Sequence, residues 1–248
     1  GTWTISDPVR SGSDLTYAAA VLGAGPVDYW RLTQSSGQIA VNEVNGHEAE
    51  LSGVTLGVPG PFHGMGVNAP TAAGFDGQGS AVYIDDAVVD TAQPYTVMTW
   101  VKLDQVAKFQ SLVVMNGDPG SAFKLSYSPS NDWQVEIARR GPNGTVSWFY
   151  IDSNHIDVVP GVWTHLAVTV DTVSRVATIY VNGVENDAEV SDLPLDVQSW
   201  QAMLGTQYGE DYLDGTLAEV AIFPRALSAG EVKAIYDAYH ASTGSPVK

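Results

Sequence analysis

Carboxylates at alternate positions of a strand are the first candidates for chemistry in this sequence. Two such groups about 5 to 5.5 Å apart on one face can act on a glycosidic bond as nucleophile and acid/base. The closest arrangements are Asp132 with Glu136, and the set Glu185, Asp187 and Glu189. The second set alternates but directly follows an Asn-Gly turn, where a solvated hairpin end explains it better. We therefore predict that neither set is catalytic and that the chain is not an enzyme.

Histidine, glycine and cysteine usage excludes several other kinds of site. The five histidines are scattered and show neither metalloprotease spacing nor the surroundings of a catalytic serine. His165 lies in the strand-like segment Trp163-Thr-His-Leu-Ala, and we expect a hydrogen-bonded structural histidine there. The glycine-rich stretches 64–66 and 74–79 lack the Gly-Lys-Ser/Thr ending of a phosphate-binding loop. The absence of cysteine excludes disulfides, thiolate metal sites and a cysteine nucleophile.

Aromatic side chains near turns indicate a binding surface. In the expected strand 146–151, Trp148 and Tyr150 share one face, while Phe149 and Ile151 share the other. Sugar rings stack on exposed aromatic faces, and neighbouring polar groups bond to their hydroxyls. The ligand-binding residues that we predict are Asp132, Trp133, Arg139, Trp148 and Tyr150. Further aromatic candidates near turns are Tyr127, Trp200, Tyr208 and Tyr212.

The charge balance limits the partners. The 248 residues include 28 acidic and 11 basic side chains, for a formal net charge of -17. A negative surface repels phosphate backbones and anionic membranes, so we expect no nucleic-acid partner. No apolar stretch approaches the roughly 20 residues that span a bilayer, so membrane insertion is not expected. Few lysines, many Asp, Gly and Thr, and aromatic-rich strands favour an extracellular or cell-surface location.

Short runs of period-two alternation, broken by Gly, Asn, Asp and Pro, predict an antiparallel β-sandwich. Hairpin turns are expected at Asn143-Gly144 and Asn182-Gly183, since a type I′ turn needs positive φ at both central residues. A C-terminal helix is expected after Ser228, an N-cap residue, with Glu231 completing a capping box. The expected strands cover residues 81–84, 95–103, 111–115, 123–127, 133–138, 146–151, 163–171, 177–181, 202–204 and 217–223.

Composition divides the chain into three parts. Residues 1–25 hold a short β-like piece at 3–5, a polar run and a short helix over 17–22, and we interpret them as a lead-in or the tail of a preceding domain. Residues 26–240 form one domain. Residues 241–248 have the small, polar composition of a linker.

Several motifs follow one another in a characteristic order. They are VDYWRL (27–32), SG (36–37), FDG (75–77), YTVMTWV (95–101), VWTHLAVTVD (162–171), ATIYVNG (177–183), LDGTL (213–217) and EVAIFPRALS (219–228). In this order they resemble the laminin-G-like, concanavalin A-like jelly-roll domains of bacterial secreted or surface proteins. The resemblance implies an all-β fold of two antiparallel sheets with a short C-terminal helix, and binding through loops or a concave face. Catalytic relatives, the laminarinase-type glycoside hydrolases, carry a Glu-x-Asp-x-x-Glu strand that this chain lacks.

The resemblance also implies a calcium site, because related sandwiches often hold a structural Ca²⁺ through hard oxygen ligands. These ligands come from an acidic side chain of the first loop, a nearby glycine carbonyl and an aspartate of the last strand. By order, the two side-chain positions fall at Asn42 and at Ala218, so other acidic groups must substitute for the usual aspartates. The metal candidates are Asp28, Asn42, Glu43, Gly46 and Glu219.

Three functions remain open from the sequence. We favour a non-catalytic extracellular module that binds a glycan, forms part of a larger protein and is monomeric in isolation. The main alternative is an adhesive or structural spacer domain whose partner is a cell-surface protein. A glycoside hydrolase is the third option, and it would require two carboxyl groups within bond-cleaving distance in a groove. Fold alone does not decide among these.

Overall fold

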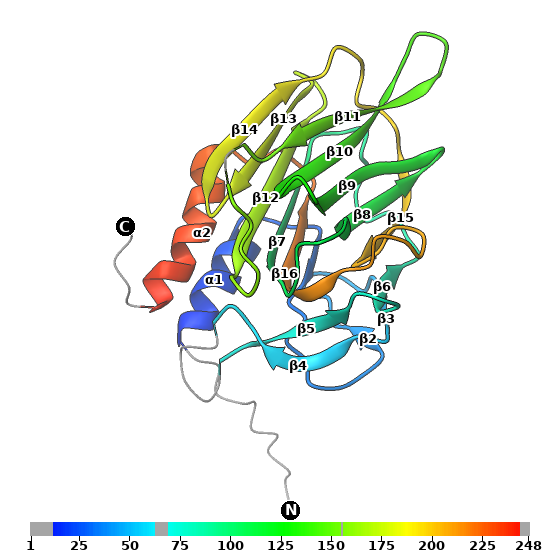
Figure 1. Ribbon diagram of the computed structural model, residues 1–248. Helices are drawn as coiled ribbons and strands as arrows, with labels where there is room; N and C mark the ends of the chain where they lie inside the picture. The colour runs from blue at the N-terminus through cyan, green and yellow to red at the C-terminus, as the bar shows by residue number, and fades with distance from the viewer. Residues whose placement is uncertain (1–11, 63–68, 155, 244–248) are drawn as a thin grey trace, which may run out of the picture.

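Two antiparallel sheets pack face to face in the computed structural model, which describes residues 12–62, 69–154 and 156–243 (Figure 1). Sheet A consists of β1 (Asp28–Trp30), β4 (Thr55–Pro59), β5 (Thr71–Asp76), β7 (Tyr95–Leu103), β12 (Thr164–Asp171), β13 (Val176–Val181), β14 (Val184–Val190) and β16 (Asp214–Phe223). Sheet B consists of β2 (Ile39–Ala40), β3 (Ala49–Ser52), β6 (Ala81–Ile84), β8 (Gln110–Gly117), β9 (Gly120–Ser128), β10 (Asp132–Arg140), β11 (Val146–Asp152) and β15 (Ser199–Leu204).

The strand order mixes segments that are distant in sequence. Sheet A runs β14-β13-β12-β7-β16-β5-β4, with β1 paired to β16, and sheet B runs β11-β10-β9-β8-β15-β6-β3-β2. The last strand of the chain, β16, therefore lies at the centre of sheet A, between β7 and β5. These features confirm the predicted two-sheet jelly-roll sandwich.

Apolar side chains at alternate strand positions fill the space between the sheets. On β10, Trp133, Val135 and Ile137 are buried in this core, while Gln134 and Glu136 are half-buried on the outer face. Burial of each large apolar side chain contributes about 1.5–3 kcal/mol relative to exposure. Since the chain has no disulfide, this packing holds the fold together.

Two helices cover the outer face of sheet A, as Figure 1 shows: α1 (Gly12–Gly23) and α2 (Ala229–Thr243). The capping box of α2 is present, since the Glu231 amide donates to Ser228 Oγ and the Ser228 amide donates to Glu231 Oε2. Among the described residues, no helix is both long and apolar enough to cross a bilayer.

Helix α1 falls in the stretch that we expected to be a lead-in, yet it packs on the sandwich. Tyr17 and Val21 are buried against sheet A, in one cluster with Val232 of α2. Residues 12–23 are therefore part of the folded unit. The β-like piece expected at 3–5 lies outside the described residues.

His165 of β12 lies in this second core among aromatic rings. Its ring centroid is 5.2 Å from that of Trp100, 5.6 Å from that of Tyr236 and 6.2 Å from that of Tyr17. In the described part of the chain, neither ring nitrogen has a hydrogen-bond partner, so the prediction of a hydrogen-bonded histidine is wrong. Burial lowers the pKa of His165 to about 3, because the surroundings disfavour the charged ring.

The two expected hairpins form with different turns. Asn182 and Gly183 both have positive φ, at 51° and 74°, which confirms the type I′ prediction. In the second hairpin only Gly144 has positive φ, and Gly141 donates to the Thr145 carbonyl across a longer loop. The hairpin prediction at Asn143-Gly144 is confirmed, but its two-residue turn is wrong.

Candidate functional site

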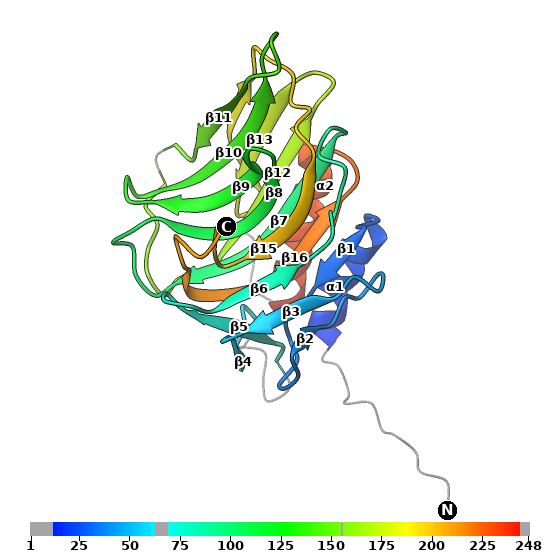
Figure 2. The same ribbon diagram turned by 90° about the vertical axis from the view of Figure 1, so that its right-hand side faces the viewer.

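The outer face of sheet B carries the candidate site, because the described helices both pack on sheet A (Figure 2). Directly paired positions form a row across this face: Tyr150 on β11, Glu136 on β10, Lys124 on β9 and Val114 on β8. The connection between β15 and β16, residues 205–213, lies against the same face and contacts Lys124. Strand pairing and one loop thus bring distant polar and aromatic side chains together.

A polar network fastens this loop to the sheet. Lys124 Nζ donates to Gln207 Oε1 at 2.7 Å and to Asp211 Oδ2 at 3.1 Å. Ser121 Oγ donates to Glu136 Oε1 at 2.7 Å and accepts from Gln207 Nε2 at 3.4 Å. Lys124 is only 8% exposed, and the Asp211 carboxylate compensates its buried charge. The loop therefore has a defined position over the face.

Trp148 and Tyr150 share a face, as the sequence predicted, and it is this outer face, while Phe149 and Ile151 pack against the core. Tyr150 is 50% exposed. Its partial burial and the adjacent Glu136 carboxylate raise its pKa. Trp148 is half-buried, and its Nε1 donates to the Ser121 carbonyl at 3.1 Å. An exposed phenol and a fixed indole thus flank the polar network.

Two further aromatic side chains stand near the turn between β8 and β9. Trp200 is 53% exposed, and its Nε1 donates to the Gly117 carbonyl at 3.3 Å. Tyr208 is 49% exposed, and its hydroxyl donates to the Gly120 carbonyl at 3.3 Å. Both were secondary candidates in the sequence, and the structure brings them close to Trp148 through the same turn.

Two of the five predicted ligand residues are not on this face. Trp133 is buried in the core between the sheets, in edge contact with Tyr127, so stacking of a ligand on it is excluded and the prediction is wrong. Arg139 lies opposite Ser147 in the strand pair, so it belongs to the other face of the sheet from Trp148. Its side chain is held by Ser147 Oγ and by Asp192. Asp132 shares the outer face, but it lies six residues from the position opposite Trp148, or about 20 Å along the strand.

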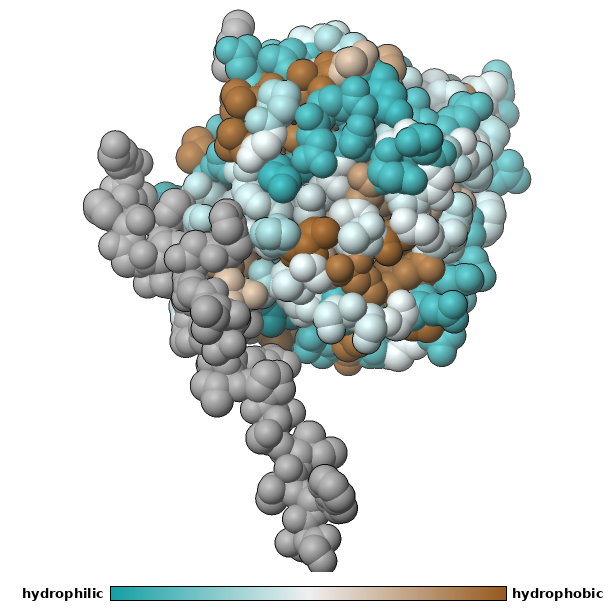
Figure 3. Space-filling view, turned by 60° about the horizontal axis from the view of Figure 1, so that its bottom comes forward, coloured by the Kyte–Doolittle hydropathy of each residue, from teal (hydrophilic) through white to brown (hydrophobic). Residues whose placement is uncertain are grey.

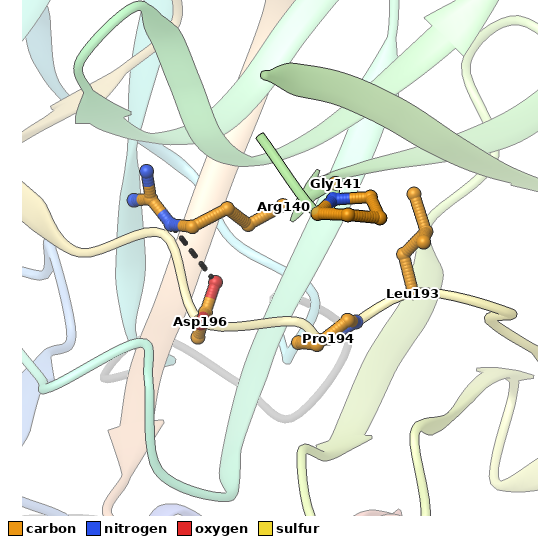
Figure 4. Close-up of a pocket in the computed structure, with 6 residues that line it drawn as sticks. Arg140, Gly141, Leu193, Pro194 and Asp196 are labelled. Carbon is orange, nitrogen blue, oxygen red and sulfur yellow. Dashed lines mark hydrogen bonds and ion pairs between the residues drawn. The ribbon is translucent and has the colours of Figure 1, made fainter. Parts of the chain in front are cut away.

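The neighbouring arginine lines a separate pocket, shown in Figure 4. Arg140 Nε donates to Asp196 Oδ1 at 3.2 Å, on one side of a cavity of about 320 Å³. Leu193 and Pro194 lie on the remaining wall. Pro142 also lines the pocket. Arg139 and Arg140 are therefore each paired with a carboxylate, as is usual for surface arginines beside acidic loops.

The carboxylates considered for catalysis are not arranged as a pair. Asp132 and Glu136 are four residues apart on β10, and Glu136 accepts from Ser121. Glu185, Asp187 and Glu189 lie on β14, at the edge of sheet A and away from this face. We expected these three residues at a solvated hairpin end, but they extend along the whole edge strand.

The first-loop position expected to bind calcium is occupied by hydrogen-bond donors. Asp28 Oδ1 accepts from Asn42 Nδ2 at 2.6 Å, from Asn45 Nδ2 at 2.8 Å and from the His47 ring at 2.8 Å. The Asn42 side-chain amide cannot flip to turn its oxygen toward Asp28 without losing two hydrogen bonds. Its Oδ1 already accepts from the backbone amides of Tyr29 and Val44. Asp28 Oδ2 is buried and has no hydrogen-bond partner among the residues that the structure describes.

This arrangement does not fit Ca²⁺, which requires six to eight oxygen ligands. Glu43 and Gly46 are exposed. Glu219 lies elsewhere, under α1, where its carboxylate pairs with Arg31 at 2.8 Å and accepts from the Tyr29 hydroxyl. The described residues contain no group of three or more His, Asp or Glu that could hold a metal ion. The candidate calcium ligands are thus divided between two hydrogen-bonded clusters.

Sequence reasoning missed Lys124, Ser121, Gln207 and Asp211. A signal existed for Lys124, because it alternates with the apolar Phe123 and Leu125 and must therefore face outward. The alternation on β10 could also have assigned Trp133 to the core. No local signal shows that the loop holding Gln207 and Asp211 lies over β9.

An antiparallel two-sheet sandwich with an open outer face is the architecture of lectin-like β-domains. The chain belongs to the concanavalin A-like lectin/glucanase superfamily, whose family model matches residues 76–233. No curated protein matches the chain.

Solved structures show the same fold at low sequence identity. The chain is similar to the botulinum neurotoxin serotype D ligand-binding domain in complex with N-acetylneuraminic acid, with a TM-score of 0.62 and 13% identity over 90% of this chain and 52% of that one. It is also similar to the botulinum neurotoxin type G receptor-binding domain, with a TM-score of 0.59 and 14% identity over 86% of this chain and 51% of that one. A third similar structure is Trypanosoma rangeli sialidase in complex with sialic acid, with a TM-score of 0.60 and 17% identity over 86% of this chain and 33% of that one. The chain thus spans about half of the toxin domains and a third of the sialidase.

Proposed function

We propose that this domain is a non-catalytic, extracellular carbohydrate-binding module that uses the outer face of sheet B. The observation that carries the proposal is the pairing of an exposed aromatic ring, Tyr150, with a fixed polar network of Lys124, Glu136 and Gln207. Flat apolar surface beside hydrogen-bonding groups is the combination that recognises a sugar ring.

The fold supports the same proposal. The solved structures that resemble the chain include a toxin ligand-binding domain whose title names a bound N-acetylneuraminic acid. The carboxylates of the face, Glu136 and Asp211, bond to Ser121 and Lys124 and hold the loop in place. These contacts favour binding over bond cleavage.

The main alternative is a docking surface for a cell-surface protein. On the end of the molecule seen in Figure 3, apolar residues gather in separate patches among hydrophilic ones. This mixed surface does not single out a docking site for a protein. The aromatic and polar grouping on sheet B is the more specific feature, so glycan binding remains our choice.

A glycan array probed with the purified domain tests the proposal, once with Ca²⁺ and once with chelator. We expect saturable binding to at least one glycan in both conditions. Tyr150→Ala should weaken it at least about tenfold, the scale of one lost aromatic contact. Val173→Ala is the matched control, because Val173 is 83% exposed in a turn of sheet A. Silence across a broad array would contradict the proposal and favour protein adhesion or a spacer.

A further inference from the structure

Three aromatic side chains are fastened by their polar edges to one turn. This turn joins β8, which ends at Gly117, to β9, which begins at Gly120. Trp200 Nε1 donates to the Gly117 carbonyl, the Tyr208 hydroxyl donates to the Gly120 carbonyl, and Trp148 Nε1 donates to the Ser121 carbonyl. We call Trp148, Trp200 and Tyr208 the turn platform. Bonds at the edges of the rings fix their orientation and leave the faces of Trp200 and Tyr208 half-exposed.

Three aromatic rings of the core between the sheets lack such bonds, although the Tyr127 hydroxyl in the same core donates to the Val106 carbonyl. Trp30 Nε1, Trp133 Nε1 and the Tyr95 hydroxyl are buried and have no hydrogen-bond partner within the described ranges. Buried polar atoms need protein partners most, whereas half-exposed ones can bond to water at little cost. Direct bonds from Trp200 and Tyr208 to the turn are therefore not required to satisfy those atoms. Their effect is to hold the rings in place, which is what a stacking surface needs.

The local backbone is shaped to place these rings. A bulge at Ser199 to Gln201 interrupts the pairing of β15 with β8, and such an extra residue re-aims a side chain. Tyr208 has positive φ, at 50°, an uncommon conformation for a bulky residue. At Gly120 a Cβ would lie 2.9 Å from Trp148 Cζ2, so only glycine lets this indole lie across the turn. A bulge, a tyrosine with positive φ and a required glycine thus together set the positions of the three rings.

Charge around the platform selects the class of ligand. Strands β8, β11 and β15 contain no Lys or Arg. The cations of β9 and β10, namely Lys124, Arg139 and Arg140, are paired with Asp211, Asp192 and Asp196. Partial burial, and secondly the negative charge of Asp118 in the turn itself, raise the pKa of Tyr208. An anionic sugar would meet this negative potential without an available positive partner.

Acceptor groups for neutral hydroxyls lie beside Trp200. Asn116 Nδ2 donates to Gln201 Oε1 at 3.2 Å, and Gln201 Nε2 donates to Asp85 Oδ1 at 3.0 Å. Side-chain amides and a carboxylate accept hydrogen bonds from sugar hydroxyls without requiring charge on the sugar.

We infer that the turn platform binds successive units of an extended, neutral polysaccharide, each ring stacking on the flat C–H face of a sugar. This inference rests on the proposed function and deepens it. Three rings around one turn form several contacts in series, so the platform selects a chain over a single terminal sugar. The sialic acid named for two similar structures is thereby excluded as the ligand of this face.

The test is calorimetric titration of the purified domain with length series of neutral β-linked glucans, mannans and xylans, one to six units long, and with sialyllactose. We expect affinity for one neutral series to rise up to about three units. Trp200→Ala should reduce that gain in affinity about tenfold, or by about 1.4 kcal/mol. Tyr208→Phe keeps the ring but removes its bond to Gly120, so it should lose less than Tyr208→Ala. Thermal melting verifies that each variant folds.

The outcomes separate this inference from the proposed function. Binding that is independent of chain length, or unaffected by both Trp200→Ala and Tyr208→Ala, would overturn the platform while leaving a glycan-binding module. Preference for sialyllactose, weakened by salt, would overturn the neutral ligand class. Failure of every glycan, sialylated or neutral, would remove the proposed function itself.

Discussion

His165 should make the domain sensitive to acid through one buried, neutral ring. Burial lowers its folded-state pKa to about 3, whereas an unfolded histidine titrates near about 6.5. Below pH 6.5 the unfolded chain therefore binds a proton that the folded chain excludes. Stability from this group is fully present above pH 6.5 and is lost progressively as the pH falls toward 3.

The size of the effect follows from the difference in pKa. Each pH unit between these two values costs about 1.4 kcal/mol, so the loss at pH 4.5 is about 3 kcal/mol. This is a large share of the 5–15 kcal/mol typical of a folded domain. Neither ring nitrogen of His165 has a hydrogen-bond partner among the described residues, so no such bond stabilises a protonated ring in the folded state.

Urea denaturation at pH 7 and at pH 4.5 measures the effect, with His165→Leu as the variant that cannot titrate. The parent should lose about 3 kcal/mol more than His165→Leu between these pH values. Glu231, whose pKa is lowered to about 2 chiefly by hydrogen bonding to Arg225, is present in both proteins and cancels in the difference. Identical pH dependence of the two proteins would refute the assignment of a neutral, buried histidine.

Three further perturbations test other parts of the structure. Gly120→Ala should lower stability by about 1–3 kcal/mol and shift the Trp148 fluorescence, because its Cβ would meet the indole and its φ is +82°; an unchanged melt and spectrum would contradict this contact. Glu219→Gln should cost about 3–5 kcal/mol in chemical denaturation, since it removes the charged carboxylate that pairs with the buried Arg31; a loss below about 1 kcal/mol would argue against the pair. Calcium and chelator should leave the melting temperature unchanged, because donors surround Asp28, and a rise with calcium would show a bound ion.

Local patterns were sufficient for much of the fold. Ser228 and Glu231 mark the start of α2 because a capping box acts within one turn of helix. Strand β7 was predicted at its observed bounds, 95–103, because its composition is strongly β-forming. Strands such as β2, only two residues long, carry too little periodicity to be recognised.

The site was less predictable because it depends on contacts between distant segments. Period two showed that Trp148 and Tyr150 share a face, but not which face of each strand meets the core. Trp200 has its outward orientation because of a bulge, which breaks the alternation on which such a prediction relies. The sequence also carried no sign that Asn45 and His47, which no motif singled out, supply hydrogen-bond donors to Asp28.

The ion pair between Lys124 and Asp211 connects the stability of the fold to the position of the proposed binding surface. Removing a lysine from water costs several kcal/mol, and an opposite charge in direct contact offsets this cost. Lys124 can therefore stay buried only while the loop that carries Asp211 lies over β9. The same loop carries Tyr208, whose hydroxyl reaches Gly120. The need of Lys124 for a nearby negative charge thus also holds Tyr208 in the position where a sugar chain would stack on it.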